Sequence, residues 1–273
     1  MPTHTFPLSG PIELAVRIAH GAVFVDTEDD LAEAQVRLEP GKNADDLLAE
    51  TTVELTGRTL TVAAPRQGGL FDLPLFGRRG GKSLEVHVRV PTGTPVKIST
   101  FTAPITIGGR VGRADLAFGS ADVALRHVDG DLRLRYGNGS AKVVRVTGSV
   151  QVRSGSGSAR FGEIGGELMA GCGSGDVQAR VVHGRVHCRC GSGTVQLGEI
   201  HGDVDVASGS GDLTVGLPAG RSVRLDLHAG AGRVDSELPI EDGPRSAEPA
   251  ISLRARTGAG NVHLVRAGAA PAA

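Results

Sequence analysis

The hydrophobic pattern of this chain repeats at a fixed interval over its central part. Four copies of Gly-Ser-Gly are centred on Ser156, Ser174, Ser192 and Ser210, each 18 residues after the one before. Apolar residues follow three and five positions after each marker, and a second such pair follows twelve and fourteen positions after the first three markers. Apolar residues two apart are typical of β-strands. The pattern therefore predicts two short strands in each 18-residue unit, with turns at Gly-Ser-Gly and at a later glycine.

Units of this length predict a parallel β-solenoid. Two short strands bury too little apolar surface to fold alone, so each unit must stack on its neighbours. Parallel crossover connections are right-handed in nearly all proteins, so we expect an all-β, right-handed, single-stranded β-helix with 18-residue coils. The same marker runs back to Thr102 and forward, with inserted residues, to Ala231 and Ala259. We expect the coil around residues 251–265 to close the end of the stack.

Residues 1–100 do not keep this period and are expected to form a β-rich N-terminal cap, continuous with the solenoid. Alternating apolar residues predict strands at 12–18, 21–25 and 84–90. Asn43 is placed to cap one short helix that follows it, with acidic residues in its first turn. We assign residues 101–266 to the solenoid and residues 267–273 to a disordered tail.

Composition changes this picture mainly through the cysteines and the N-terminus. The chain has 273 residues, a formal net charge of −1 and three cysteines. An odd cysteine count in a long chain implies no disulfide framework. The N-terminus shows neither the basic segment nor the cleavage site of a signal peptide. We therefore expect a cytoplasmic protein, with the cell surface as the alternative, and no membrane span because the apolar runs are short.

Arginine-rich outward positions mark one candidate binding surface. Residues 110–189 contain 12 Arg or Lys against seven Asp or Glu. The outward slots of the predicted strands hold Arg133, Arg135, Arg153 and Arg189. Such a local excess favours an anionic polymer as partner, whereas a solvated face that discourages edge aggregation is the alternative. The near-neutral whole chain gives no reason to expect specific binding of nucleic acid.

The loop at residues 66–82 is a second candidate surface. It carries Phe71 and Phe76 together with Arg78 and Arg79. Exposed aromatic residues beside arginine are common at protein interfaces. Packing of both phenylalanines against the side of the solenoid is the alternative.

Neither a metal nor a cofactor is predicted, although two patterns resemble metal sites. Cys172 and Cys190 share one stacked position and Cys188 takes a core slot, so we expect small core cysteines rather than ligands. Stacked His183 and His201 lack a third ligand in the sequence pattern. The aspartates of Gly-Ser-Gly-Asp, at positions 176 and 212, do not recur from unit to unit as they do in calcium-binding β-rolls.

One catalytic hypothesis stays open. A carbohydrate-active β-helix enzyme needs a carboxylate cluster, and the candidates are Asp129, Asp131, Asp203 and Asp205. The chain lacks tryptophan to stack on sugar rings. We therefore expect no enzymatic activity.

The repeat resembles the bacterial putative-adhesin family. The segments GSGDVQA, GSGTVQL, SGSGDLTV and IHGDVDV carry the likeness, which covers residues 100–265. The resemblance implies a β-strand-repeat domain of unknown function, related to the head domains of adhesins, with no catalytic residues to transfer. We therefore predict a non-catalytic scaffold that binds protein or anionic polymer through its faces and the 66–82 loop. An exported cell-surface adhesin is the alternative, and self-association stays open.

Overall fold

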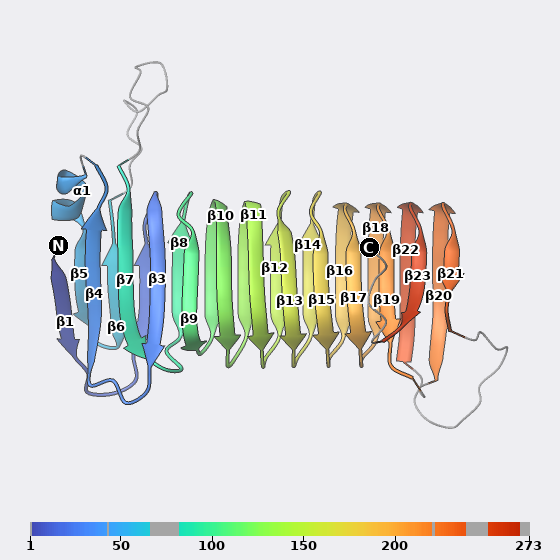
Figure 1. The fold of residues 1–273 in the computed structure, drawn as a ribbon, viewed down its shortest axis with the longest axis horizontal. Helices are drawn as coiled ribbons and strands as arrows, with labels where there is room; N and C mark the ends of the chain where they lie inside the picture. The colour runs from blue at the N-terminus through green and yellow to red at the C-terminus, as the bar shows by residue number, and fades with distance from the viewer. Residues whose placement is uncertain (1, 43, 66–81, 220–221, 239–250, 268–273) are drawn as a thin grey trace, which may run out of the picture. The chain divides into compact units, whose positions relative to one another are not determined.

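The computed structural model describes residues 2–42, 44–65, 82–219, 222–238 and 251–267. These residues form an all-β fold whose strands pair largely in parallel, with one short helix (Figure 1). The chain divides into two compact units, Met1–Asp129 and Gly130–Ala273. Each unit is described by itself below.

Unit 1, Met1–Asp129, contains two rows of hydrogen-bonded strands that both end on β10 (Ala114–Val128). The first row is β1 (Thr3–Pro7), β4 (Glu33–Pro40), β7 (Leu84–Pro91), β3 (Gly21–Glu28) and β9 (Ile105–Val111). The second row is β5 (Thr52–Thr56), β6 (Thr59–Ala63), β2 (Glu13–Arg17) and β8 (Val96–Thr100). Pairings β1–β4, β4–β7 and β5–β6 are antiparallel, and the others are parallel.

The strands of unit 1 form where apolar and polar residues alternate. Buried and solvent-facing positions alternate along β4 and β7, with Val36, Leu38, Val86 and Val88 at most 2% exposed. Side chains two apart in a strand share a face, so the apolar set lies inside and the polar set outside. The strands predicted at 12–18, 21–25 and 84–90 are confirmed as β2, β3 and β7.

The predicted helix is present, but its predicted cap is wrong. Helix α1 spans Asp45–Glu50 and carries Asp45 and Asp46 in its first turn. Its N-cap is Ala44, and no side chain of that residue caps the helix. Asn43 itself lies outside the described residues. Among the described residues, no helix has the length and apolar character needed to cross a membrane.

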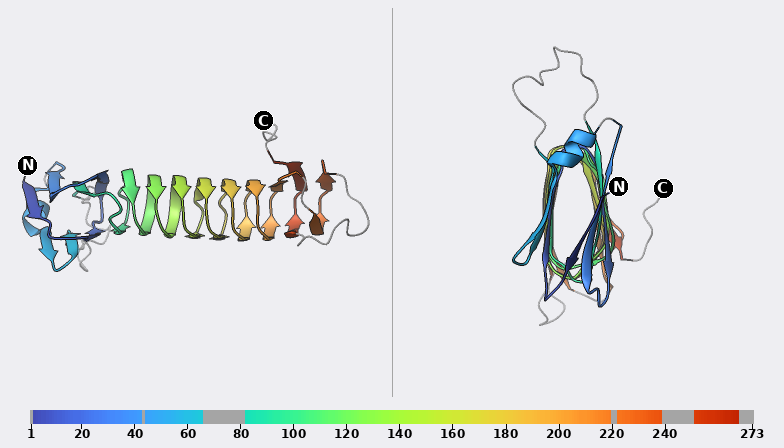
Figure 2. Two further views of the ribbon diagram at one scale, coloured as in Figure 1. Left: turned by 90° about the horizontal axis from the view of Figure 1, so that it is seen from below. Right: turned by 90° about the vertical axis from the view of Figure 1, so that its left-hand side faces the viewer.

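Unit 2, Gly130–Ala273, also contains two rows, and its strand pairings among the described residues are parallel (Figure 2). Row A consists of the first part of β11 (Leu132–Val146), β12 (Val150–Ser154), β14 (Leu168–Cys172), β16 (Val186–Ser192), β18 (Val204–Ser210), β22 (Ile251–Ala259) and β20 (Val223–Ala231). Row B consists of the second part of β11, β13 (Ser158–Ile164), β15 (Val177–Val182), β17 (Val195–Ile200), β19 (Leu213–Leu217), β23 (Val262–Arg266) and β21 (Val234–Ser236).

The 18-residue repeat of the sequence equals the offset between paired residues of neighbouring strands in unit 2. From β11 to β19 each residue pairs with the residue 18 positions later, as in Leu132 with Val150 and Val195 with Leu213. The inward positions of these strands hold apolar residues that are almost fully buried, such as Leu134 and Val206. One strand from row A and the next from row B, joined by a turn, are called a coil below.

The last two coils are stacked in the reverse of chain order. The coil of β22 and β23 pairs with β18 and β19, whereas β20 and β21 pair with the far side of β22 and β23 (Figure 1). The prediction that residues 251–265 close the stack is therefore wrong. Burial follows this order: Leu253 and Ala255 of β22 are fully buried between neighbours, while their register partners Leu225 and Leu227 of the end strand β20 are only partly buried.

The Gly-Ser-Gly turns stack closely enough to require glycine at their third residue. Ser192 pairs in register with Ser210, and the backbone N–H of Ser192 donates to the carbonyl of Gly173 at 2.8 Å. Gly193 and Gly211 have φ of +136° and +131°, a region that favours glycine. A Cβ at either position would collide with a carbonyl oxygen of the preceding coil. The repeated glycine therefore follows from both backbone conformation and close stacking.

Candidate interaction surface

The predicted outward arginines lie on the outer face of row A in unit 2. Alternate residues of each strand point outward, and the parallel register places them in two columns that cross the row. The first column is Arg133, Gln151, Met169, His187, Asp205, Arg254 and Asp226. The second column is Arg135, Arg153, Gly171, Arg189, Ala207, Arg256 and His228. The four arginines predicted as a site therefore share one face.

The strands β11 and β12 carry a cluster of three exposed arginines, Arg133, Arg135 and Arg153, which we call the arginine patch. Arg135 is the register partner of Arg153, on strands about 4.8 Å apart. The Nε of Arg133 donates a hydrogen bond to Oε1 of Gln151 at 3.0 Å. Among the described residues, no acidic side chain occupies either column on these two strands. The patch therefore places three guanidinium groups close together on one part of the face.

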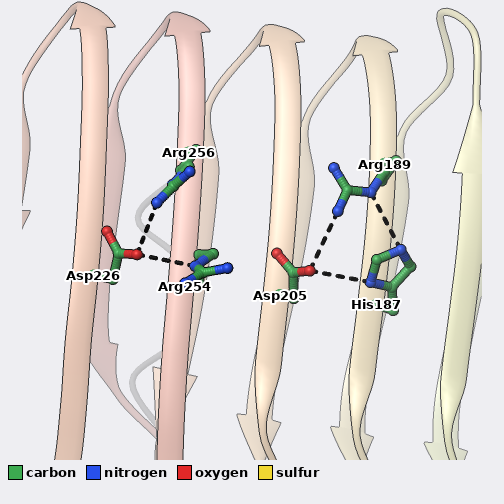
Figure 3. A network of polar contacts seen from close by, with 6 residues as sticks. All are labelled: His187, Arg189, Asp205, Asp226, Arg254 and Arg256. Atoms are coloured by element: carbon green, nitrogen blue, oxygen red, sulfur yellow. Dashed lines mark hydrogen bonds and ion pairs between the residues drawn. The ribbon is translucent and has the colours of Figure 1, made fainter.

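The strands β16, β18, β22 and β20 carry the same columns with a different charge balance. Asp205 Oδ2 lies 3.3 Å from both His187 Nδ1 and Arg189 Nη2, and Arg189 Nε donates to His187 Nε2 at 3.2 Å. Asp226 accepts hydrogen bonds from Arg254 and Arg256, each at 2.9 Å. Figure 3 shows these six residues, which we call the paired network.

The arginines of the paired network all contact carboxylates: Arg189 contacts Asp205, and Arg254 and Arg256 share Asp226. Hydrogen bonds from Arg256 and Arg254 hold the pKa of Asp226 below its ordinary value of 3.8. The carboxylate therefore stays ionised between two guanidinium groups. Arg189, predicted together with the patch, belongs to this half because Asp205 contacts it.

An uncharged strand separates the two halves of the face. β14 contributes Met169 and Gly171 at the outward positions, and Met169 is 44% exposed. The arginine patch and the paired network are therefore distinct charge environments on one sheet.

Row B carries a smaller set of charged residues. Lys142 pairs in register with Arg160, and Arg160 Nε donates to Gln178 at 3.0 Å. The stacked rings of His183 and His201 have centroids 5.1 Å apart. Their Nε2 atoms lie 3.3 Å from Glu163 and 3.0 Å from Glu199, respectively. The sequence analysis missed both carboxylates as partners, although Glu199 lies only two residues before His201.

The proposed catalytic carboxylates hold neighbouring strands together. Asp129 contacts Arg110 at 3.0 Å within unit 1. In unit 2, Asp131 and Asp203 accept backbone N–H groups of Ser149 and Ser252 at 2.9 and 3.0 Å, and Asp205 is part of the paired network. Asp203 and Asp205 also line a shallow groove on row A with Arg185, His187, Ser252 and Arg254. Each carboxylate thus has a structural contact.

The aspartates of the Gly-Ser-Gly-Asp turns have the same kind of role. Asp176 accepts the backbone N–H of Thr194 at 2.9 Å, and Asp212 accepts that of Asn261 at 2.8 Å. Each carboxylate therefore connects its own coil to the next one in the stack.

The prediction that the cysteines imply no disulfide is wrong. The register places Cys172 beside Cys190 with Cα atoms 4.6 Å apart, and their sulfur atoms are bonded. Cys188 is a buried free thiol, and burial raises its pKa to about 12. The repeat did predict that Cys172 and Cys190 share a stacked position. Three cysteines in one stretch fit one disulfide and one core residue, which a count alone does not distinguish.

The second predicted surface is not tested here. Phe71, Phe76, Arg78 and Arg79 lie outside the described residues. Their contribution to an interface stays a prediction.

The toastrack family model DUF4097 matches residues 13–264 of this chain. Solved structures similar to the chain include a putative lipid binding protein from Parabacteroides distasonis (TM-score 0.45, 13% identity, 97% of each chain covered). They also include putative adhesins from Bacteroides fragilis (0.41, 13%, 97% of this chain and 96% of that chain) and Parabacteroides merdae (0.38, 12%, 97% and 96%). No curated protein matches the chain. With TM-scores this low, these structures add no argument, and the family rests on the family model.

Proposed function

Because this chain belongs to the toastrack family DUF4097, we propose that it is a non-catalytic binding protein that holds an anionic polymer on the arginine patch. The observation that carries the proposal is the register of Arg135 with Arg153, with Arg133 on the same face. The fold that presents the patch is, in this proposal, a right-handed solenoid with 18-residue coils. The 18-residue offset of the strand pairs supports the coil length, and the general handedness of parallel crossovers supports the hand.

A polyanion suits the chemistry of the patch. Guanidinium groups donate two parallel hydrogen bonds to carboxylate, sulfate or phosphate groups. The patch residues are fixed on neighbouring strands, so their guanidinium groups are already close together before any partner binds. A polyanion that contacts them releases its own counterions, which favours binding at low salt.

Titration of a fluorescent heparin oligosaccharide, followed by anisotropy at low salt, tests this proposal. The double variant Arg135→Gln/Arg153→Gln should bind several-fold more weakly than wild type, since each exposed charge contact contributes about 0.2–1 kcal/mol. The matched control, Arg254→Gln/Arg256→Gln, removes two arginines from the same face but from the paired network. It should change the affinity less than about twofold, because these groups are already paired.

Two results would count against the proposal. Equal losses in the two double variants would show that net charge, rather than the patch, governs binding. Equal affinity of the wild type for heparin and for uncharged dextran of similar length would show that the surface does not select anions.

The cell-surface adhesin is the second candidate, and the disulfide favours it. Disulfides persist in oxidising compartments and are rare in the cytosol, and Cys172 is bonded to Cys190. The cytoplasmic location predicted from the N-terminus has no support from the fold. Fractionation of the native cell with rapid thiol blocking tests the alternative. Protein confined to the cytosol with three free thiols per chain would remove it, and surface protein with one free thiol per chain would support it.

A further inference from the structure

In unit 1, the outer face of β4 and β7 brings two carboxylates and an imidazole together. The antiparallel register sets Glu39 directly opposite Glu85, and His87 follows Glu85 on the same face. The intervening residues of both strands are buried, so these three side chains share the solvent side. These three residues belong to unit 1, whereas the arginine patch belongs to unit 2.

The distances among the three groups fit a shared ion better than direct hydrogen bonds. His87 Nε2 lies 3.9 Å from both Glu39 Oε1 and Glu85 Oε2, which is longer than a hydrogen bond. All three potential ligand atoms lie within 4.8 Å of one another. A point equidistant from the three atoms would be about 2.1–2.5 Å from each, a range whose lower end matches zinc–nitrogen and zinc–oxygen bond lengths.

We propose that Glu39, Glu85 and His87 bind one divalent transition-metal ion, with Zn²⁺ the best match. Three nitrogen and oxygen ligands leave a coordination position for water or an exogenous ligand. The imidazole favours Zn²⁺ over Mg²⁺ and Ca²⁺, which prefer oxygen ligands alone. A dication also offsets the repulsion between two carboxylates that face each other across the strand pair.

A neighbouring aromatic ring holds the imidazole in place. Phe24 of β3 is the register partner of His87, and the two rings stack with centroids 4.7 Å apart and an interplanar angle of 14°. Phe24 is therefore a positioning residue for the ligand. A shallow groove also opens beside the imidazole, lined by Thr3, Asp26, Gln35, Arg37, His87, Val88 and Arg89.

Arg37 competes with the ion for one carboxylate. Its guanidinium contacts Glu39 Oε1, the same atom that lies near His87. Half of the Arg37 side chain is exposed, so it has space to move away when an ion binds. Because of this contact, we expect that removal of the Arg37 guanidinium strengthens metal binding.

Isothermal titration of the untagged full chain with ZnCl₂ tests the site. We expect one Zn²⁺ per chain in wild type and a loss of at least about 100-fold in affinity for His87→Ala, because a ligand matters more than its supporting shell. Glu85→Gln should also weaken binding, and Phe24→Leu should weaken it about tenfold. Arg37→Met should tighten it a few-fold, and MgCl₂ at the same concentration should give no saturable binding.

The control is His183→Ala, which removes a histidine of unit 2 that also lies close to a carboxylate. It should bind Zn²⁺ as wild type does. Absence of saturable Zn²⁺ binding in wild type overturns the proposal, and so does binding lost in His183→Ala but kept in His87→Ala. A thermal shift with Zn²⁺ that wild type shows and folded His87→Ala lacks separates loss of the ligand from loss of the fold.

Discussion

The arginine patch and the paired network lie on the same sheet face, in the same two columns, yet their charges are balanced differently. In the network, Asp205 contacts His187 and Arg189 on the neighbouring strand, and Asp226 contacts Arg254 and Arg256. In the patch, Arg135 faces Arg153 and the remaining column positions are Arg133 and Gln151. An outward arginine therefore has different charged neighbours in the patch and in the network, depending on the residues that the adjacent coil contributes.

The difference shows that the surroundings of an outward side chain in a stacked fold depend on the residues of adjacent coils, as well as on its neighbours along the chain. Along the chain, Arg153 and Arg189 occupy equivalent slots and look alike. Across the stack, Arg153 has Arg135 and Gly171 as register partners, whereas Arg189 has Asp205 close by in the adjacent column. The register partners of a charged residue therefore describe its surroundings better than a count of charges along the chain does.

The largest expected effect concerns the scaffold that carries the network. Leu253→Ala should lower the free energy of unfolding by about 2–5 kcal/mol, because Leu253 is fully buried between β18 and β20. Leu225→Ala, at its register partner on the end coil, should cost less than half as much because Leu225 is only partly buried. Urea unfolding measures both. A larger loss for Leu225→Ala would mean that the two coils stack in chain order and that the network is wrongly assembled.

A smaller effect is expected when the paired network is made to resemble the arginine patch. Asp205→Asn/Asp226→Asn removes the acids that neutralise the network while keeping side-chain size. Heparin affinity should rise about three-fold, since the arginines that contacted these carboxylates become available to the polymer. Anisotropy titration gives the value, with circular dichroism as the check on folding. An unchanged or weaker affinity would show that pairing is not what separates the two halves.

The smallest expected effect is an acid dependence that only the network should have. The pKa of Asp226 is lowered in the folded state by Arg256 and Arg254, so its contribution to stability is present above the ordinary pKa of 3.8 and is lost as pH falls through the lowered value. The difference in Tm between wild type and Asp226→Asn should therefore shrink between about pH 5 and about pH 3. Arg135→Gln/Arg153→Gln should follow the wild-type acid profile. A constant difference between wild type and Asp226→Asn over this range would contradict the lowered pKa.

The sequence predicts the regular part of the fold because each coil repeats the same local constraints. The 18-residue marker, the alternate apolar slots and the turn glycines agree with one another, so register follows from counting, and Arg135 was bound to meet Arg153. The order of the last coils does not follow from counting, because the coils of residues 223–236 and 251–266 satisfy the same pattern. Only their relative burial distinguishes them, and burial depends on which neighbour each finds.

The candidate sites were predictable to different extents. The three residues of the arginine patch lie within the repeat and could be named from the sequence, whereas the contact of Arg189 with Asp205 could not. The cluster of Glu39, Glu85 and His87 depends on antiparallel pairing of β4 with β7, strands that are separated by α1, β5 and β6 in the chain. No periodic signal links those residues. The disulfide between Cys172 and Cys190 falls between these cases, since the repeat placed both residues side by side and only the bond was missed.

The most direct test of the binding account is the salt dependence of heparin affinity in three proteins. The slope of log K against log salt counts the counterions released by charge contacts, roughly one for each arginine that contacts the polymer. The account predicts that Arg135→Gln/Arg153→Gln has a slope smaller than wild type by about two, and that Arg254→Gln/Arg256→Gln keeps the wild-type slope. A slope that falls equally in both variants, or in neither, would contradict the claim that the polymer binds on the arginine patch.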